Sequence, residues 1–117
     1  MVSKYKVTPL SGYGRKIIYE KEYREWNVKW GTINFKIKYE YLVDIMNNFF
    51  VNSNEWYPLG ASMNKPIKGG LGEYVKGNIP SLTPRHASAI AAILYNENLI
   101  SVKGKKPICL KKVVNWL

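Results

Sequence analysis

The segments 26–30 and 33–38 alternate apolar and polar residues with a period of two, which is typical of half-buried β-strands. Gly31 and Thr32 between them suit a two-residue hairpin connection. We expect an antiparallel hairpin whose apolar face bears Trp26, Val28, Trp30, Ile33, Phe35 and Ile37. The opposite face would carry Lys29, Lys36 and Lys38. This pattern favours a one-sided sheet with a solvated lysine face over a nucleic-acid groove.

Shorter strands are expected before this hairpin, over 5–8 and 16–20. Helical spacing begins after it, over 39–51. The apolar residues of this segment fall on one side of a helix, at Leu42, Ile45, Met46, Phe49 and Phe50. A second, short helix is expected over 71–76.

The longest predicted helix begins at Thr83 and Pro84, because threonine caps exposed amide groups and proline suits the first helical position. Asn98 would end it, since asparagine tolerates the left-handed backbone common at helix ends. The buried face recurs at Ala87, Ile90, Ala91 and Leu94. The opposite face has small or polar residues at Arg85, Ser88, Ala89, Ala92 and Asn96. Paired strands at 99–103 and 107–111 follow, joined by Gly104-Lys105-Lys106.

The order of short helix, turn, longer helix and hairpin with a basic tip resembles the winged helix-turn-helix superfamily. The resemblance is carried by 71–76, by 83–98 and by the hairpin tipped by Gly104-Lys105-Lys106. It implies a winged-helix-like three-helix core with a C-terminal β-hairpin wing. Together with the N-terminal antiparallel β-hairpin that the alternation predicts, the expected fold class is α+β. A single domain over 1–117 is expected, β-rich in 1–38 and winged-helix-like in 39–117.

The segment 53–70 departs from the winged-helix pattern, in which far fewer residues join the first two helices. It contains two prolines and three glycines and has no clean period. A loop of this length inside a compact domain is usually functional or partly structured. Lys65, Lys68, Gly69 and Gly70 lead into the helix at 71–76 and would offer ammonium and amide groups to a phosphate. They match no phosphate-binding loop motif.

The net charge of the chain indicates which class of molecule it would bind. The chain has 18 basic and 8 acidic residues, a net charge of +10, and the excess is concentrated in its second half. Residues 1–57 carry nine basic and six acidic side chains, whereas 58–117 carry nine and two. A basic field of this kind favours nucleic acid over an acidic membrane or an acidic protein. The plainer interpretation is a solvated, lysine-rich surface.

The resemblance implies how duplex DNA would be bound. The helix at 83–98 would enter the major groove through Arg85, Ser88, Ala89, Ala92 and Asn96. The wing would contact backbone or minor groove through Lys103, Lys105 and Lys106. Positioning charge would come from Lys65, Lys68 and Lys76. The function expected is a transcriptional regulator or a DNA-handling protein of a mobile element or defence system.

Three alternatives stay open at this point. The small residues at Ser88, Ala89 and Ala92 would also suit close packing of two helices, which would make the protein a homodimer. The charge and the 14% aromatic content fit an RNA-binding or ribosome-associated protein equally well. A small basic interaction module, such as an inhibitor acting on a nucleic-acid machine, is the third.

Catalytic and metal chemistry is not predicted. Cys109 is alone, so the chain offers neither a disulfide framework nor a thiolate metal cluster. His86 is the only histidine, and we expect it to pack or contact phosphate. Glu73 and Lys76 are three residues apart, but no second acid lies near them in sequence, as a nuclease would need. We expect a non-enzyme without cofactor or metal, with a nuclease as the minor alternative, since Glu20, Glu22 and Glu25 could converge only through the fold. We also expect a cytoplasmic protein with no membrane partner, because no signal or membrane-spanning pattern is found.

Overall fold

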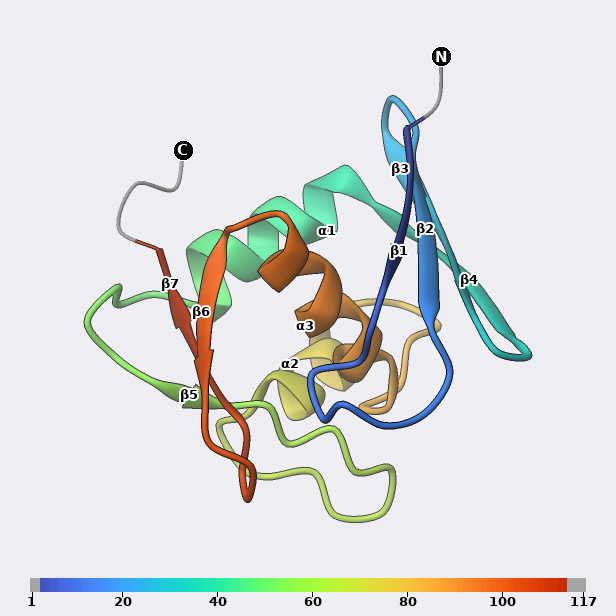
Figure 1. Cartoon of the computed structure of the whole chain (residues 1–117). Coiled ribbons are helices and arrows are strands. Elements are labelled where there is room, and N and C mark those ends of the chain that lie inside the picture. Colours follow the sequence, from blue (N-terminus) through green and yellow to red (C-terminus); the bar gives the residue numbers. More distant parts are fainter. Residues whose placement is uncertain (1–2, 114–117) are drawn as a thin grey trace.

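A four-stranded antiparallel sheet forms the first part of the chain (Figure 1). The structure is a computed structural model that describes residues 3–113. The strands follow one another in the order β1 (Ser3–Val7), β2 (Ile17–Lys21), β3 (Glu25–Trp30) and β4 (Ile33–Lys38). Trp26 pairs with Ile37, and Trp30 pairs with Ile33. The predicted hairpin and its single apolar face are therefore confirmed, and the two shorter strands are present with slightly different bounds.

The helices lie close to where periodicity places them, but the predicted start of the longest one is wrong. It begins at His86 and not at Thr83 and Pro84, and no side chain caps its first turn. The helices are α1 (Tyr39–Asp44), its π-helical continuation η1 (Ile45–Phe49), α2 (Leu71–Asn78) and α3 (His86–Asn96). All five apolar residues expected to line the first helical segment are buried. The protein is thus an α+β fold, and no described helix has the length and apolarity needed to cross a bilayer.

A second, three-stranded sheet has the order β5-β7-β6. It contains the predicted C-terminal hairpin, β6 (Ile100–Lys103) and β7 (Cys109–Lys112), together with the two-residue strand β5 (Tyr57–Pro58). The sequence pattern did not predict β5, because a strand this short has no period. Its pairing with β7 places the start of the long loop beside the hairpin.

The long loop is held against α2 by backbone contacts. The N–H of Gly72 donates to the carbonyl of Leu59 over 2.9 Å. A Cβ at Gly72 would lie only 2.1 Å from the carbonyl oxygen of Gly60, so the close approach requires glycine at this position. The loop 53–70, which is longer than the winged-helix pattern would have it, is thus packed against α2.

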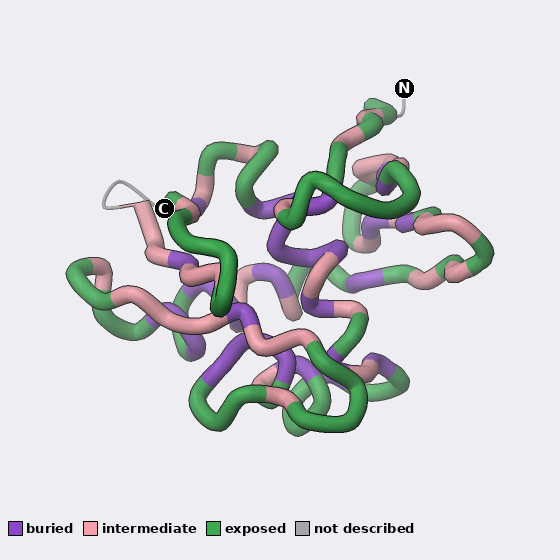
Figure 2. The backbone as a smooth tube through the Cα atoms, turned by 60° about the horizontal axis from the view of Figure 1, so that its bottom comes forward, coloured by how far each residue is buried: buried purple, intermediate pink, exposed green. Residues whose placement is uncertain are grey.

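The helix α3 lies between the two sheets and is the centre of the core (Figure 1). Figure 2 shows buried segments gathered in the interior and exposed ones at the hairpin tips. The buried residues of α3 are Ala87, Ala89, Ile90, Ala91, Ala92, Ile93 and Leu94. The predicted buried face is therefore confirmed, but the prediction that Ala89 and Ala92 are exposed is wrong. Both are within 2% of complete burial, because β1 and β2 cover the second side of the helix.

Candidate nucleic-acid interface

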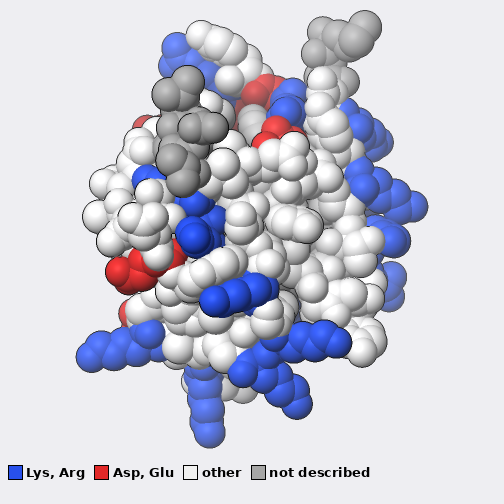
Figure 3. Space-filling model, turned by 60° about the vertical axis from the view of Figure 1, so that its left-hand side comes forward, with Lys and Arg blue, Asp and Glu red and all other residues white. Residues whose placement is uncertain are grey.

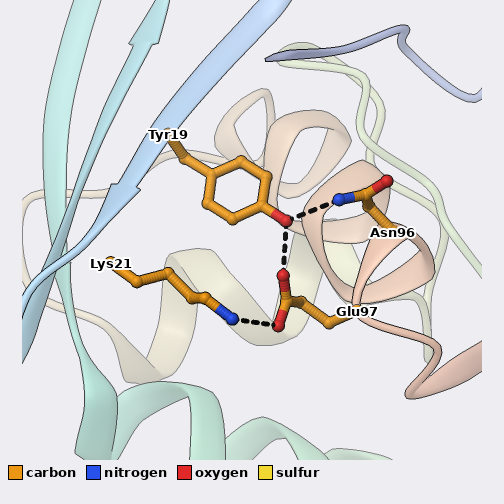
Figure 4. Close-up of polar contacts among 4 residues, drawn as sticks. All are labelled: Tyr19, Lys21, Asn96 and Glu97. Atoms are coloured by element: carbon orange, nitrogen blue, oxygen red, sulfur yellow. Dashed lines mark hydrogen bonds and ion pairs between the residues drawn. The ribbon is translucent and has the colours of Figure 1, made fainter. Parts of the chain in front are cut away.

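The C-terminal end of α3 is joined to the four-stranded sheet by a polar cluster (Figure 4). The buried Tyr19 hydroxyl donates to Glu97 Oε2 over 2.6 Å and accepts a hydrogen bond of 2.8 Å from the Asn96 side chain. Lys21 Nζ lies 2.7 Å from Glu97 Oε1. Asn96 was predicted to contact bases, but its amide is already engaged with Tyr19. Its role in the described structure is to hold the sheet on the helix.

The same cluster raises the pKa of two of its members, Tyr19 and Lys21. Burial raises the pKa of Tyr19 well above its usual value, and the hydrogen bond to Glu97 raises it further. The hydrogen bond to Glu97 also raises the pKa of Lys21. Tyr19 therefore stays neutral and Lys21 stays charged across the physiological range. This keeps the hydroxyl a donor and the ammonium group a partner for the carboxylate.

The N-terminal end of α3 carries an exposed cation of the predicted reading helix. Arg85 is exposed, with its guanidinium carbon 5.8 Å from the centre of the Trp30 ring, whereas Ser88 is half-buried. His86 Nδ1 accepts the Thr83 N–H over 2.9 Å, and its ring packs edge-on against Phe35. The expected packing role of His86 is therefore confirmed. Of the five predicted groove residues, Ala89 and Ala92 are buried and Asn96 is hydrogen-bonded to Tyr19. Arg85 and Ser88 are the two that are left to contact a ligand.

The amides before α2 do not form the phosphate site that the sequence suggested. The N–H of Gly69 donates to Glu73 Oε1 over 3.0 Å, and the N–H of Gly70 donates to the carbonyl of Ile67 over 2.9 Å. Both donors are thus satisfied internally, and a carboxylate stands where an anion would approach. Lys65 and Lys68 are nonetheless exposed on this loop.

The hairpin β6–β7 gathers cations around one aromatic ring. Lys103 Nζ lies 4.3 Å from the centre of the Trp56 ring, and Lys111 Nζ lies 5.4 Å from it. Lys105 and Lys106 are exposed at the tip of the same hairpin. We call these five residues the basic wing. Figure 3 shows lysine and arginine side chains projecting along the lower edge of the molecule, where the hairpin tip and the 60–70 loop lie.

The charges of the basic wing are not neutralised within the described part of the chain. The ion pairs found over residues 3–113 join Lys4 to Glu20 and Lys21 to Glu97, and neither involves the wing. Lys103, Lys105 and Lys106 were predicted as wing contacts from the sequence, whereas Trp56 and Lys111 were not. The available signal for Trp56 was a large aromatic residue within the polar run 52–56.

The remaining predicted residue, Lys76, is exposed in the last turn of α2. A cation in this position is favoured by the negative end of the helix dipole. Lys76 therefore lies on α2 and is not part of the basic wing. Among residues 3–113, no group of three or more His, Cys, Asp and Glu side chains could hold a metal ion.

No protein-family model matches the chain, and neither a search of curated proteins nor one of solved structures found a match.

Proposed function

We propose that this protein binds nucleic acid through the basic wing. The observation that carries the proposal is the pair of ammonium groups over Trp56, next to two exposed tip lysines. Lysines supply phosphate contacts that do not depend on sequence, and a half-exposed indole ring supplies a stacking surface for a base. Lys65 and Lys68 add charge from the neighbouring loop. The proposed role is binding and not catalysis.

The winged-helix interpretation is part of this proposal in a modified form. The order α1, α2, α3 and β6–β7 hairpin supports it. The burial of Ala89 and Ala92 removes the central face of α3 from any groove, and it also removes that face as a dimer contact. Duplex DNA would therefore be held mainly by the wing, with Arg85 as an added contact at the start of α3. A regulator or DNA-handling protein of a mobile element or defence system is the corresponding biological role.

The test neutralises the tip of the wing. Lys105→Gln with Lys106→Gln should weaken binding to a labelled DNA duplex and make the salt dependence shallower. If both lysines contact phosphate, the slope of log affinity against log salt should fall by about 1.8, since each duplex contact contributes about 0.9. Fluorescence anisotropy over a salt series measures both quantities. Unchanged affinity and slope would contradict the proposal.

A matched control is available on the other side of the molecule. Arg24→Gln with Lys38→Gln removes the same charge from an exposed hollow that also contains Glu25 and Glu40. Because the cations there are balanced by carboxylates, this variant should bind almost as well as the unchanged protein. An equal loss in the control would mean that net charge, and not the wing, governs binding.

A single-stranded ligand is the second candidate, and Trp56 is the observation that favours it. Base stacking on an aromatic ring contributes about 1 to 3 kcal/mol per base in single-strand binding. Trp56→Leu should therefore weaken binding to single-stranded DNA or RNA far more than binding to a duplex. Equal losses on both ligands would leave the duplex as the preferred partner.

A further inference from the structure

The outer face of the four-stranded sheet carries a second group of cations. Strand alternation directs Tyr19 and Val28 into the core and their neighbours outward. Across the sheet, Lys6 pairs with Ile18 and Ile18 pairs with Lys29. In the next row, the outward residues are Lys4, Glu20, Asn27 and Lys36. Figure 3 shows part of this side as a column of lysine and arginine side chains along its right-hand edge.

This face carries two shallow, open depressions. Two adjoining depressions of about 430 and 330 Å³ share Ile18 and Lys29. Shorter side chains, including Asn27 and Asn34, line the first depression between the long lysines. The cations that line the two are Lys4, Lys6, Arg15, Lys16, Lys29 and Lys36. The shape admits a ligand between the ammonium groups.

The charge of this face is nearly uncompensated. Glu20 is the single carboxylate that lines either depression, against six cations. It pairs with Lys4 over 3.6 Å, and both side chains are exposed, so solvent screens the pair. Like charges gathered on one surface raise the local concentration of polyanions. Phe35 lines the first depression, but its ring packs edge-on against His86 on the inward side of β4, which favours backbone contacts over base stacking on this face.

We propose that the outer face of the sheet is a second surface that binds the phosphate backbone of nucleic acid. It shares no residue with the basic wing. The two surfaces lie on different sides of the central α3, one on the four-stranded sheet and the other on the three-stranded sheet (Figure 1). One protein molecule therefore holds two nucleic-acid segments at once. This last step rests on the proposed function of the wing, whereas backbone binding by the sheet does not.

The first test measures the sheet surface alone. Lys6→Gln with Lys29→Gln removes the two cations that flank Ile18 on neighbouring strands. Both are exposed, so circular dichroism and the melting temperature should stay unchanged. On a labelled DNA duplex, the salt slope should become shallower by about 1.8, whereas Arg24→Gln, at an exposed cation that lines neither depression, should leave the slope unchanged. A sheet variant that behaves like this control would overturn the proposal, whatever the wing variant does.

The second test measures two segments together. Two duplexes that carry donor and acceptor dyes are mixed with the protein, and energy transfer between them is recorded. The unchanged protein should bring the dyes together, and both Lys6→Gln with Lys29→Gln and Lys105→Gln with Lys106→Gln should abolish the transfer. Absence of transfer with the unchanged protein would overturn the two-segment arrangement. Transfer that persists in the sheet variant would also overturn it, because a dimer joined to DNA by its wings would give that result.

Discussion

Tyr19 in β2 and Glu97 at the end of α3 are joined by a hydrogen bond of 2.6 Å, although 78 positions separate them in the chain. The bond closes the four-stranded sheet over one side of α3. Asn96 and Lys21 complete the cluster from the helix and the strand. This contact explains why the helix that resembles a DNA-reading element is instead the centre of the core.

Tyr19→Phe should lower the free energy of unfolding. The change removes the hydroxyl that donates to a carboxylate, and hydrogen bonds to charged groups contribute about 1.5 to 3 kcal/mol. Urea unfolding followed by circular dichroism measures the loss. Tyr13→Phe is the matched control, because Tyr13 is 81% exposed and should tolerate the same chemical change. Equal stability of the two variants would show that the cluster does not hold the sheet on α3.

Ala92→Glu should disrupt the fold and not merely the binding. Ala92 is 2% exposed, so a carboxylate there would be buried without a partner, at a cost of roughly 3 kcal/mol or more. Tyr95→Glu, on the exposed side of the same helix, should fold normally. Thermal melting of both variants distinguishes the cases. A stable Ala92→Glu protein that fails to bind DNA would restore the groove-reading helix.

Two glycines of α2 should respond to alanine in opposite directions. At Gly72 a Cβ would clash with the Gly60 carbonyl, which predicts a loss of about 1 to 3 kcal/mol. At Gly77 a Cβ would meet nothing within 4 Å, so alanine should add about 0.5 to 1 kcal/mol through its higher helix propensity. Urea unfolding of the two variants checks this difference. A neutral Gly72→Ala would mean that the long loop is not packed on α2.

Stability should fall as His86 becomes protonated. Burial lowers the pKa of His86 below its usual value of 6.5, and the nearby Arg85 lowers it further. The unfolded chain therefore binds the proton more readily than the folded one. The contribution of neutral His86 to the free energy of unfolding is complete above about pH 6.5 and is lost as the pH falls below this value. His86→Gln should remove this part of the pH dependence, which urea unfolding from about pH 7.5 to 5.5 would measure. An unchanged profile would contradict the prediction.

Most of the local elements of this protein follow from the sequence alone, with the two-residue strand β5 as an exception. The alternation in 26–30 and 33–38 dictates a hairpin, because only a period of two puts every tryptophan and isoleucine on one side of a strand. The spacing of Leu42, Ile45 and Phe49 dictates a helix for the corresponding reason. These patterns involve neighbours in the chain, and physical preferences between neighbours can be read without the fold.

The tertiary structure decided what covers each element. Ala89 and Ala92 form a small-residue face that would suit a DNA groove, a second helix or a sheet, and the sequence does not discriminate among these. The contact of α3 with β1 and β2 settles the choice, because it depends on the packing of segments far apart in the chain. The amide of Gly69 is likewise hydrogen-bonded to Glu73, and the two cations over Trp56 come from β6 and β7, more than 40 positions along the chain from the ring. Periodicity reports that a face is apolar or small, whereas the identity of its neighbour is a property of the whole folded chain.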